Sequence, residues 1–167
     1  MTPPRAPFRG DGDDEPDGRE RRIMVVEDSA SARRLLQQLL LGLGVGLPDL
    51  RLAASVPEAL QTFAQWTPAI VFVDLELRPP LHPPPGVPPV TDAMPKDGAE
   101  LALELLRRDP STRLIVCSAT DARETIVGDL VRAGRIQAIV KPLLAAKVKD
   151  VLDRATTAPP SPASRRR

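Results

Sequence analysis

The chain has 167 residues, 42% of them hydrophobic, which suits one globular domain with a buried core. Its 23 Lys and Arg residues nearly balance its 22 Asp and Glu residues, so bulk charge does not favour nucleic acid or an anionic membrane as an obligatory partner. The longest apolar run, residues 39–47, is too short to span a bilayer, and residues 1–22 contain no secretory signal. We therefore expect a cytoplasmic protein, and a single cysteine, which cannot form an internal disulfide, is compatible with a reducing compartment.

Both ends of the chain have the composition of disordered segments. Residues 1–22 are rich in acidic residues, arginine and proline, and cannot bury enough apolar surface to offset chain entropy. Residues 157–167 have the same character and end in a basic tip, which would bind phosphate groups only weakly. We therefore expect a disordered arm, a folded domain over 23–156 and a disordered basic tail.

Strand-like and helix-like segments alternate along the folded part. In chain order we expect a strand at 23–26, a helix at 30–44, a strand at 50–54, a helix at 57–66, a strand at 69–73, a helix at 97–109, a strand at 114–117, a helix at 122–134, a strand at 136–140 and a helix at 143–155. Five strand–helix units in succession predict an α/β fold, a doubly wound parallel sheet of five strands with helices on both faces.

Polar residues follow four of the five apolar runs directly. Glu27 and Asp28 follow the first strand, Asp74 the third, Ser118 the fourth and Lys141 the fifth. Ligands of open parallel sheets bind at the carboxyl ends of the strands. The pattern therefore brings three carboxylates, a hydroxyl and an ammonium group to one edge of the sheet.

This set of groups suits phosphoryl chemistry. Clustered carboxylates repel one another, and a hard divalent cation such as Mg²⁺ relieves the repulsion. Asp74 is then a candidate nucleophile toward a phosphoryl group. Mg²⁺ and Lys141 would neutralise the charge of the transferred group, and the Ser118 hydroxyl could donate to one of its oxygens. The sequence thus indicates reversible aspartyl phosphorylation.

Over residues 23 to 155 the sequence resembles the receiver domain of two-component response regulators, in particular single-domain chemotaxis regulators. The matching stretches are IMVVEDSASARRLL, VFVDLEL, IVCSAT and IVKP. The resemblance implies a flavodoxin-like fold with sheet order 2-1-3-4-5.

The resemblance also implies a role for each position that matches the motifs. Asp74 would be the phosphoacceptor, Glu27 and Asp28 the acidic pair that organises Mg²⁺, Ser118 the switch hydroxyl and Lys141 the phosphate-contacting base. The backbone carbonyl of Glu76 would complete the metal shell together with Asp74. The side chains of Glu76 and Thr120 lie where the family tunes the lifetime of the phosphoryl group.

The partners implied are those of a stand-alone regulator. A sensor histidine kinase or a phosphotransfer protein would donate the phosphoryl group, and a downstream protein would bind the face formed by about residues 122–155. A second copy of the chain is a possible partner at that face. We expect no enzymatic activity beyond self-phosphorylation and autodephosphorylation at Asp74, and no DNA-binding output domain after the last helix.

The sequence departs from the family pattern at two places. Asp74 and Gly98 are 24 residues apart, where receivers have about eight, and eight of the 18 residues from Arg78 to Pro95 are proline. Residues 78–96 are therefore a Pro-rich insertion: a surface loop without a role, a lid over Asp74, or a docking strip with PxxP spacing. Ala138 stands where receivers carry an aromatic residue, which puts the usual coupling to Ser118 in doubt.

Two other functions remain open at this point. A phosphorylation-independent pseudo-receiver, acting as a binding module, is suggested by Ala138 and the insertion. A phosphohydrolase of the haloacid dehalogenase type would also use an aspartyl nucleophile, Mg²⁺ and a lysine. Those enzymes carry a second aspartate where this chain has Glu76, and they need a cap domain larger than the chain can supply.

Overall fold

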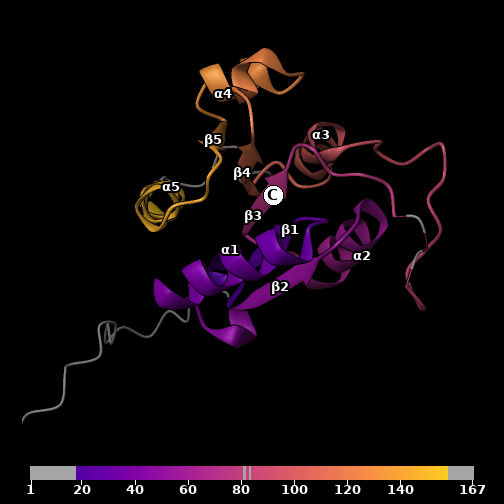
Figure 1. The fold of residues 1–167 in the computed structure, drawn as a ribbon, viewed down its shortest axis with the longest axis horizontal. Coiled ribbons are helices and arrows are strands. Elements are labelled where there is room, and N and C mark those ends of the chain that lie inside the picture. The colour runs from indigo at the N-terminus through magenta and orange to yellow at the C-terminus, as the bar shows by residue number, and fades with distance from the viewer. Residues whose placement is uncertain (1–17, 81, 83, 158–167) are drawn as a thin grey trace, which may run out of the picture.

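The computed structural model describes residues 18–80, 82 and 84–157, and its centre is a parallel sheet (Figure 1). Within this part of the chain the sheet has five strands, β1 (Ile23–Val26), β2 (Leu50–Ala53), β3 (Ile70–Asp74), β4 (Arg113–Ser118) and β5 (Ile136–Val140). Their order is β2-β1-β3-β4-β5, and every neighbouring pair is parallel. The predicted doubly wound α/β fold is confirmed.

Helices connect the strands. The α-helices of the described residues are α1 (Ala30–Gly42), α2 (Val56–Trp66), α3 (Gly98–Arg108), α4 (Gly128–Arg132) and α5 (Ala145–Thr157). Short 3₁₀ helices are η1 (Gly18–Arg21), η2 (Leu47–Asp49) and η3 (Ala122–Glu124). Three α-helices begin with a side-chain cap: Ser29, Ser55 and Asp97 each accept a hydrogen bond from an amide in the first turn.

The strands are apolar on both faces because helices cover both. On β3, Val71 and Val73 pack into a core with α2 and α3, whereas Ile70 and Phe72 pack into a second core with α1 and α5. Figure 1 shows these two pairs of helices on opposite sides of the sheet. Burial on both faces explains why the strands read as continuous apolar runs rather than as alternating ones.

The helix expected over 122–134 is wrong in its extent, because η3 and the short α4 replace it. Residues 125–127 are all β-branched, which lowers helix propensity. The Thr125 hydroxyl donates to the Ala122 carbonyl (2.7 Å) and so competes with a helical turn. Gly128 then approaches the backbone of Arg123 so closely that an added Cβ would lie 2.2 Å from its carbonyl oxygen. The chain folds back at this point.

The expected arm begins to contact the domain earlier than its composition indicated. Residues 1–17 and 158–167 lie outside the described residues, but residues 18–22 form η1 and its connection to β1. The Arg19 side chain pairs with Asp109, and the Arg22 side chain donates to the Trp66 carbonyl (2.8 Å). These two arginine contacts extend the structured part of the chain to Gly18, and composition alone does not predict them.

The Pro-rich insertion leaves β3 and returns at α3, and in Figure 1 the chain between them extends outward beside α2 and α3. Met94 packs against the core on that side of the sheet. An apolar pocket of about 260 Å³ lies between the start of α2 and the insertion, lined by Val56, Pro57, Pro79, Pro80 and Val90 among others. Met94 therefore anchors the end of the insertion on the α2 and α3 side of the sheet, and a pocket lies between other described residues of the insertion and the start of α2. None of the helices described here is long and apolar enough to cross a membrane.

Candidate functional site

The carboxyl ends of β1, β3, β4 and β5 meet at one edge of the sheet and carry the residues predicted from the strand-end pattern. Backbone hydrogen bonds continue past the strands and fix these ends. The Glu27 amide donates to the Ala53 carbonyl (3.1 Å), and the Lys141 amide donates to the Ser118 carbonyl (2.8 Å). The side chains of these strand ends are therefore presented by hydrogen-bonded backbone rather than by free loops.

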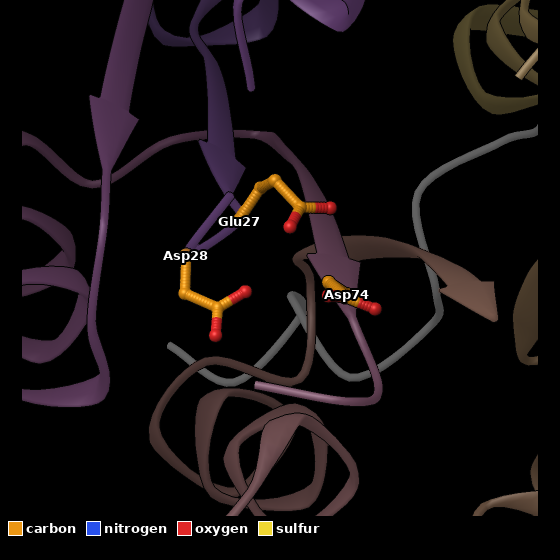
Figure 2. Close-up of side chains that lie close together, drawn as sticks. All are labelled: Glu27, Asp28 and Asp74. Carbon is orange, nitrogen blue, oxygen red and sulfur yellow. The ribbon is translucent and has the colours of Figure 1, made fainter. Parts of the chain in front are cut away.

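Three carboxylates converge at this edge (Figure 2). Glu27, Asp28 and Asp74 each place an oxygen within 4.8 Å of the others. Glu27 and Asp74 are each only 4% exposed, and Asp28 is half-buried. Figure 2 shows Glu27 and Asp28 at the end of β1 and Asp74 at the tip of the neighbouring β3. The acidic cluster expected from the sequence is present.

Backbone amides hold each of these carboxylates. The Ser29 amide donates to Glu27 Oε1 (3.0 Å), and the Glu76 amide donates to Asp74 Oδ1 (3.1 Å). The Arg78 amide, at the start of the insertion, donates to Asp28 Oδ2 (3.2 Å). One contact of the insertion with the acidic cluster is therefore a backbone hydrogen bond to Asp28.

The raised pKa of Glu27 reflects its burial and its repulsion by Asp74. Burial, followed by the charge of Asp74, raises the pKa of Glu27 to about 7, even though the Ser29 amide and Lys141 act to lower it. Glu27 is therefore only partly ionised near neutral pH, and a bound cation would favour its ionised form. The donor set is made of hard oxygen ligands only and fits Mg²⁺, which binds through a few carboxylates together with water and phosphate oxygens.

Lys141 is the cation that the chain itself supplies. Its Nζ lies 3.1 Å from Asp74 Oδ1 and 3.5 Å from Glu27 Oε2. Burial alone would lower the pKa of Lys141, but the hydrogen bond to Asp74 and the charges of both carboxylates outweigh it and raise that pKa. Lys141 is therefore a fixed positive charge next to Asp74.

Ser118 lies across the site from the acidic pair, at the end of β4. Its hydroxyl Oγ is 3.4 Å from Glu76 Oε1 and 3.4 Å from the Thr120 hydroxyl, and the Thr120 amide donates to it (3.1 Å). Glu76 Oε1 also accepts from the Ala119 amide (3.0 Å). The structure thus brings Ser118, Glu76 and Thr120 together beside Asp74.

Two features of the site had not been predicted from the sequence. The Glu76 carboxylate reaches across to Ser118 and Ala119, a contact between positions more than 40 residues apart. The Arg33 guanidinium donates to the backbone carbonyls of Glu27 (2.7 Å) and Asp28 (3.3 Å) and braces the turn after β1. The contact of Arg33 could have been predicted, because Arg33 lies near the start of the helix that directly follows the acidic pair.

Ala138 lies on β5 opposite Val116 of β4. It is half-buried and packs against the core on the α2 and α3 side, which also includes Leu130 and Val131 of α4. A methyl group therefore occupies the position where the resemblance led us to expect an aromatic ring.

The comparisons with known proteins agree with this geometry, although no family model matches the chain. The chemotaxis protein CheY of Thermotoga maritima is 25% identical over 135 residues, covering 80% of this chain and 96% of CheY. The receiver domain of NtrX from Brucella abortus has a TM-score of 0.63 and 26% identity, covering 81% of this chain and 99% of that structure. The response regulator TrrA of Thermotoga maritima, in complex with Mg²⁺ and BeF, has a TM-score of 0.59 and 21% identity, covering 80% and 97%.

Proposed function

Because the homologues of this chain are CheY-like response regulators and its structural neighbours are receiver domains, we propose that it is a receiver switched by phosphorylation of Asp74. The observation that carries the proposal is the environment of Asp74. This buried carboxylate lies within 4.8 Å of two further carboxylates and 3.1 Å from the Lys141 ammonium. A candidate nucleophile, further carboxylate oxygens that could hold a cation, and a positive charge thus lie close together, which supports the proposal.

The proposed reaction is transfer of a phosphoryl group from a phosphohistidine. An Asp74 oxygen attacks phosphorus, an O–P bond forms, and the P–N bond breaks with imidazole as the leaving group. Lys141 neutralises charge on the phosphoryl oxygens, and the Ser118 hydroxyl donates to one of them. Glu27, Asp28, Asp74 and the backbone carbonyl of Glu76 would hold Mg²⁺, which supplies further neutralisation of charge.

The proposed partners are proteins. The donor is a sensor histidine kinase or a phosphotransfer protein in the cytoplasm, and the output is a protein contact at residues 122–155. The exposed apolar side chains of Ile126, Val140 and Leu144 in that region support a protein-binding face, which a second copy of the chain could also use. Nothing in the charge balance favours nucleic acid or a membrane as partner.

Acetyl phosphate tests the proposal without knowledge of the kinase. The chain is incubated with acetyl phosphate and Mg²⁺ and its intact mass is measured, beside Asp74→Asn and beside a sample with a chelator. We expect a gain of one phosphoryl group in the wild type only. No gain in any sample would contradict the proposal.

A phosphorylation-independent binding module is the second candidate, and Ala138 is the observation that favours it. With a methyl group against Val116, this chain lacks the ring expected to couple Ser118 to the output face. Equal binding of a partner by the wild type with acetyl phosphate and by Asp74→Asn would support this module. Turnover of a generic aryl phosphate would instead indicate a phosphohydrolase.

A further inference from the structure

The Glu76 carboxylate is bound by the groups that surround Asp74. Its Oε1 accepts from the Ala119 amide (3.0 Å) and lies 3.4 Å from Ser118 Oγ, and its Oε2 lies 3.9 Å from Lys141 Nζ. Two hydrogen-bond donors and one ammonium group therefore converge on a single anionic side chain. All three come from the ends of β4 and β5, and Glu76 comes from the turn after β3.

Asp74 lies directly beside this arrangement. Lys141 Nζ donates to Asp74 Oδ1 (3.1 Å), and the Glu76 amide donates to the same oxygen (3.1 Å). A phosphoryl group on Asp74 would need donors to its oxygens, and Ser118, Ala119 and Lys141 are the donors next to it. A carboxylate and a phosphoryl group are both oxyanions that accept charge-assisted hydrogen bonds, so they would compete for these donors.

We propose that the Glu76 side chain is an internal competitor that occupies the oxyanion position of the site and must leave it when Asp74 is phosphorylated. This inference rests on the proposed function. It concerns the side chain of Glu76, whereas the expected metal contact of this residue is its backbone carbonyl.

The strength of the competition follows from exposure. The Glu76 side chain is 47% exposed, so water screens its contacts, and its distance to Lys141 is long for an ion pair. The competitor therefore weakens the binding of a phosphoryl group rather than preventing it. We expect its removal to tighten binding by about fivefold, the scale of one net hydrogen bond.

Beryllofluoride, a mimic of the phosphoryl group, tests the inference. We would titrate beryllofluoride in the presence of Mg²⁺ against the wild type, Glu76→Ala and Glu76→Gln, and follow binding by ¹⁹F NMR. The matched control is Glu20→Ala, an exposed glutamate of η1 that precedes β1 and so lies at the opposite edge of the sheet. A second readout, with no metal or beryllofluoride present, is the amide resonance of Ala119 in each protein.

The inference predicts a half-saturating concentration about fivefold lower for Glu76→Ala, an intermediate value for Glu76→Gln and no change for Glu20→Ala. The Ala119 resonance should move upfield in Glu76→Ala, because its hydrogen bond to a carboxylate is lost. Equal binding by all four proteins, or an unchanged Ala119 resonance, would overturn the competitor role and leave the proposed function standing. If none of the four binds beryllofluoride, the proposed function itself is overturned, and the competitor role with it.

Discussion

A Cβ atom added to Gly98 would lie 1.8 Å from the carbonyl oxygen of Asp74. Gly98 is the first residue of α3 and follows the Asp97 cap, so the helix begins directly against the backbone of the candidate phosphoacceptor. The Pro-rich insertion thus starts and ends at nearly the same point in space. A longer loop raises the entropic cost of bringing its two ends together, but here the ends of β3 and α3 are still in direct contact.

Gly98→Ala should therefore displace either α3 or the end of β3. Relief of so short a contact requires a backbone shift, and we expect a loss of about 1–3 kcal/mol in the free energy of unfolding. Urea denaturation measures the loss. The matched control is Gly42→Ala at the end of α1, where an added Cβ meets nothing within 4 Å. Similar stabilities of the two variants would contradict the close approach.

Lys141→Met should slow phosphorylation of Asp74 by acetyl phosphate by about 100- to 1,000-fold, the scale for loss of one positioned electrostatic group. The reason is that Lys141 Nζ contacts Asp74 directly. The measurement is the rate at which the intact mass increases, under the same Mg²⁺ concentration.

Lys149→Met is the matched control for this change. Lys149 lies on α5 and pairs with Asp153 at the surface, so its removal should leave the phosphorylation rate unchanged. Equal slowing by both substitutions would mean that net charge, rather than the position of Lys141, governs the reaction.

The residues at the strand ends could be predicted from the sequence because a parallel sheet aligns them. Once β1, β3, β4 and β5 are parallel neighbours, the residues that follow them reach one edge whatever the loops do. The closeness of Glu27, Asp74 and Lys141 therefore follows from strand order and register, and the structure confirms it. Their chemical roles stay predictions until the phosphorylation experiment is done.

Features set by loop conformation could not be predicted in this way. The contact of Glu76 with Ser118 depends on how the turn after β3 directs one side chain, and no periodic pattern encodes that direction. The break between η3 and α4 at residues 125–127 depends on two effects, the weak helix propensity of these residues and the close approach of Gly128 to Arg123. Tertiary contacts decide both, because the local preferences there are small.

The insertion should influence the acidic cluster through the backbone of Arg78. Its amide donates to Asp28 Oδ2 (3.2 Å), so Arg78→Pro removes a hydrogen bond that orients one carboxylate of the cluster. We expect the affinity for Mg²⁺ to fall about threefold, because the lost bond is exposed and worth at most about 1 kcal/mol. Isothermal titration calorimetry measures the affinity.

Arg78→Ala is the control, because it removes the side chain and keeps the amide. Its affinity for Mg²⁺ should match that of the wild type. If both substitutions weaken binding equally, loss of the Arg78 side chain, rather than loss of the backbone hydrogen bond, accounts for the effect. An unchanged affinity for Mg²⁺ in Arg78→Pro would show that the backbone of the insertion does not influence the cation site.

The ionisation of Glu27 should make the stability of the metal-free protein depend on pH. Burial, and the charge of Asp74, raise the pKa of Glu27 from 4.5 to about 7 in the folded state. Between these two values the folded chain binds more protons than the unfolded chain, so stability falls as the pH rises through this window. A shift of this size corresponds to roughly 3 kcal/mol.

Glu27→Gln isolates this contribution. Its free energy of unfolding should lack the decline between pH 4.5 and 7 that the wild type shows, whereas the exposed control Glu124→Gln should keep it. Mg²⁺ should stabilise the wild type more at pH 8 than at pH 5.5, because it binds the ionised carboxylates. Parallel profiles for Glu27→Gln and the wild type would show that Glu27 ionises in the folded chain as it does in the unfolded one. The acidic cluster would then have no electrostatic need for a cation.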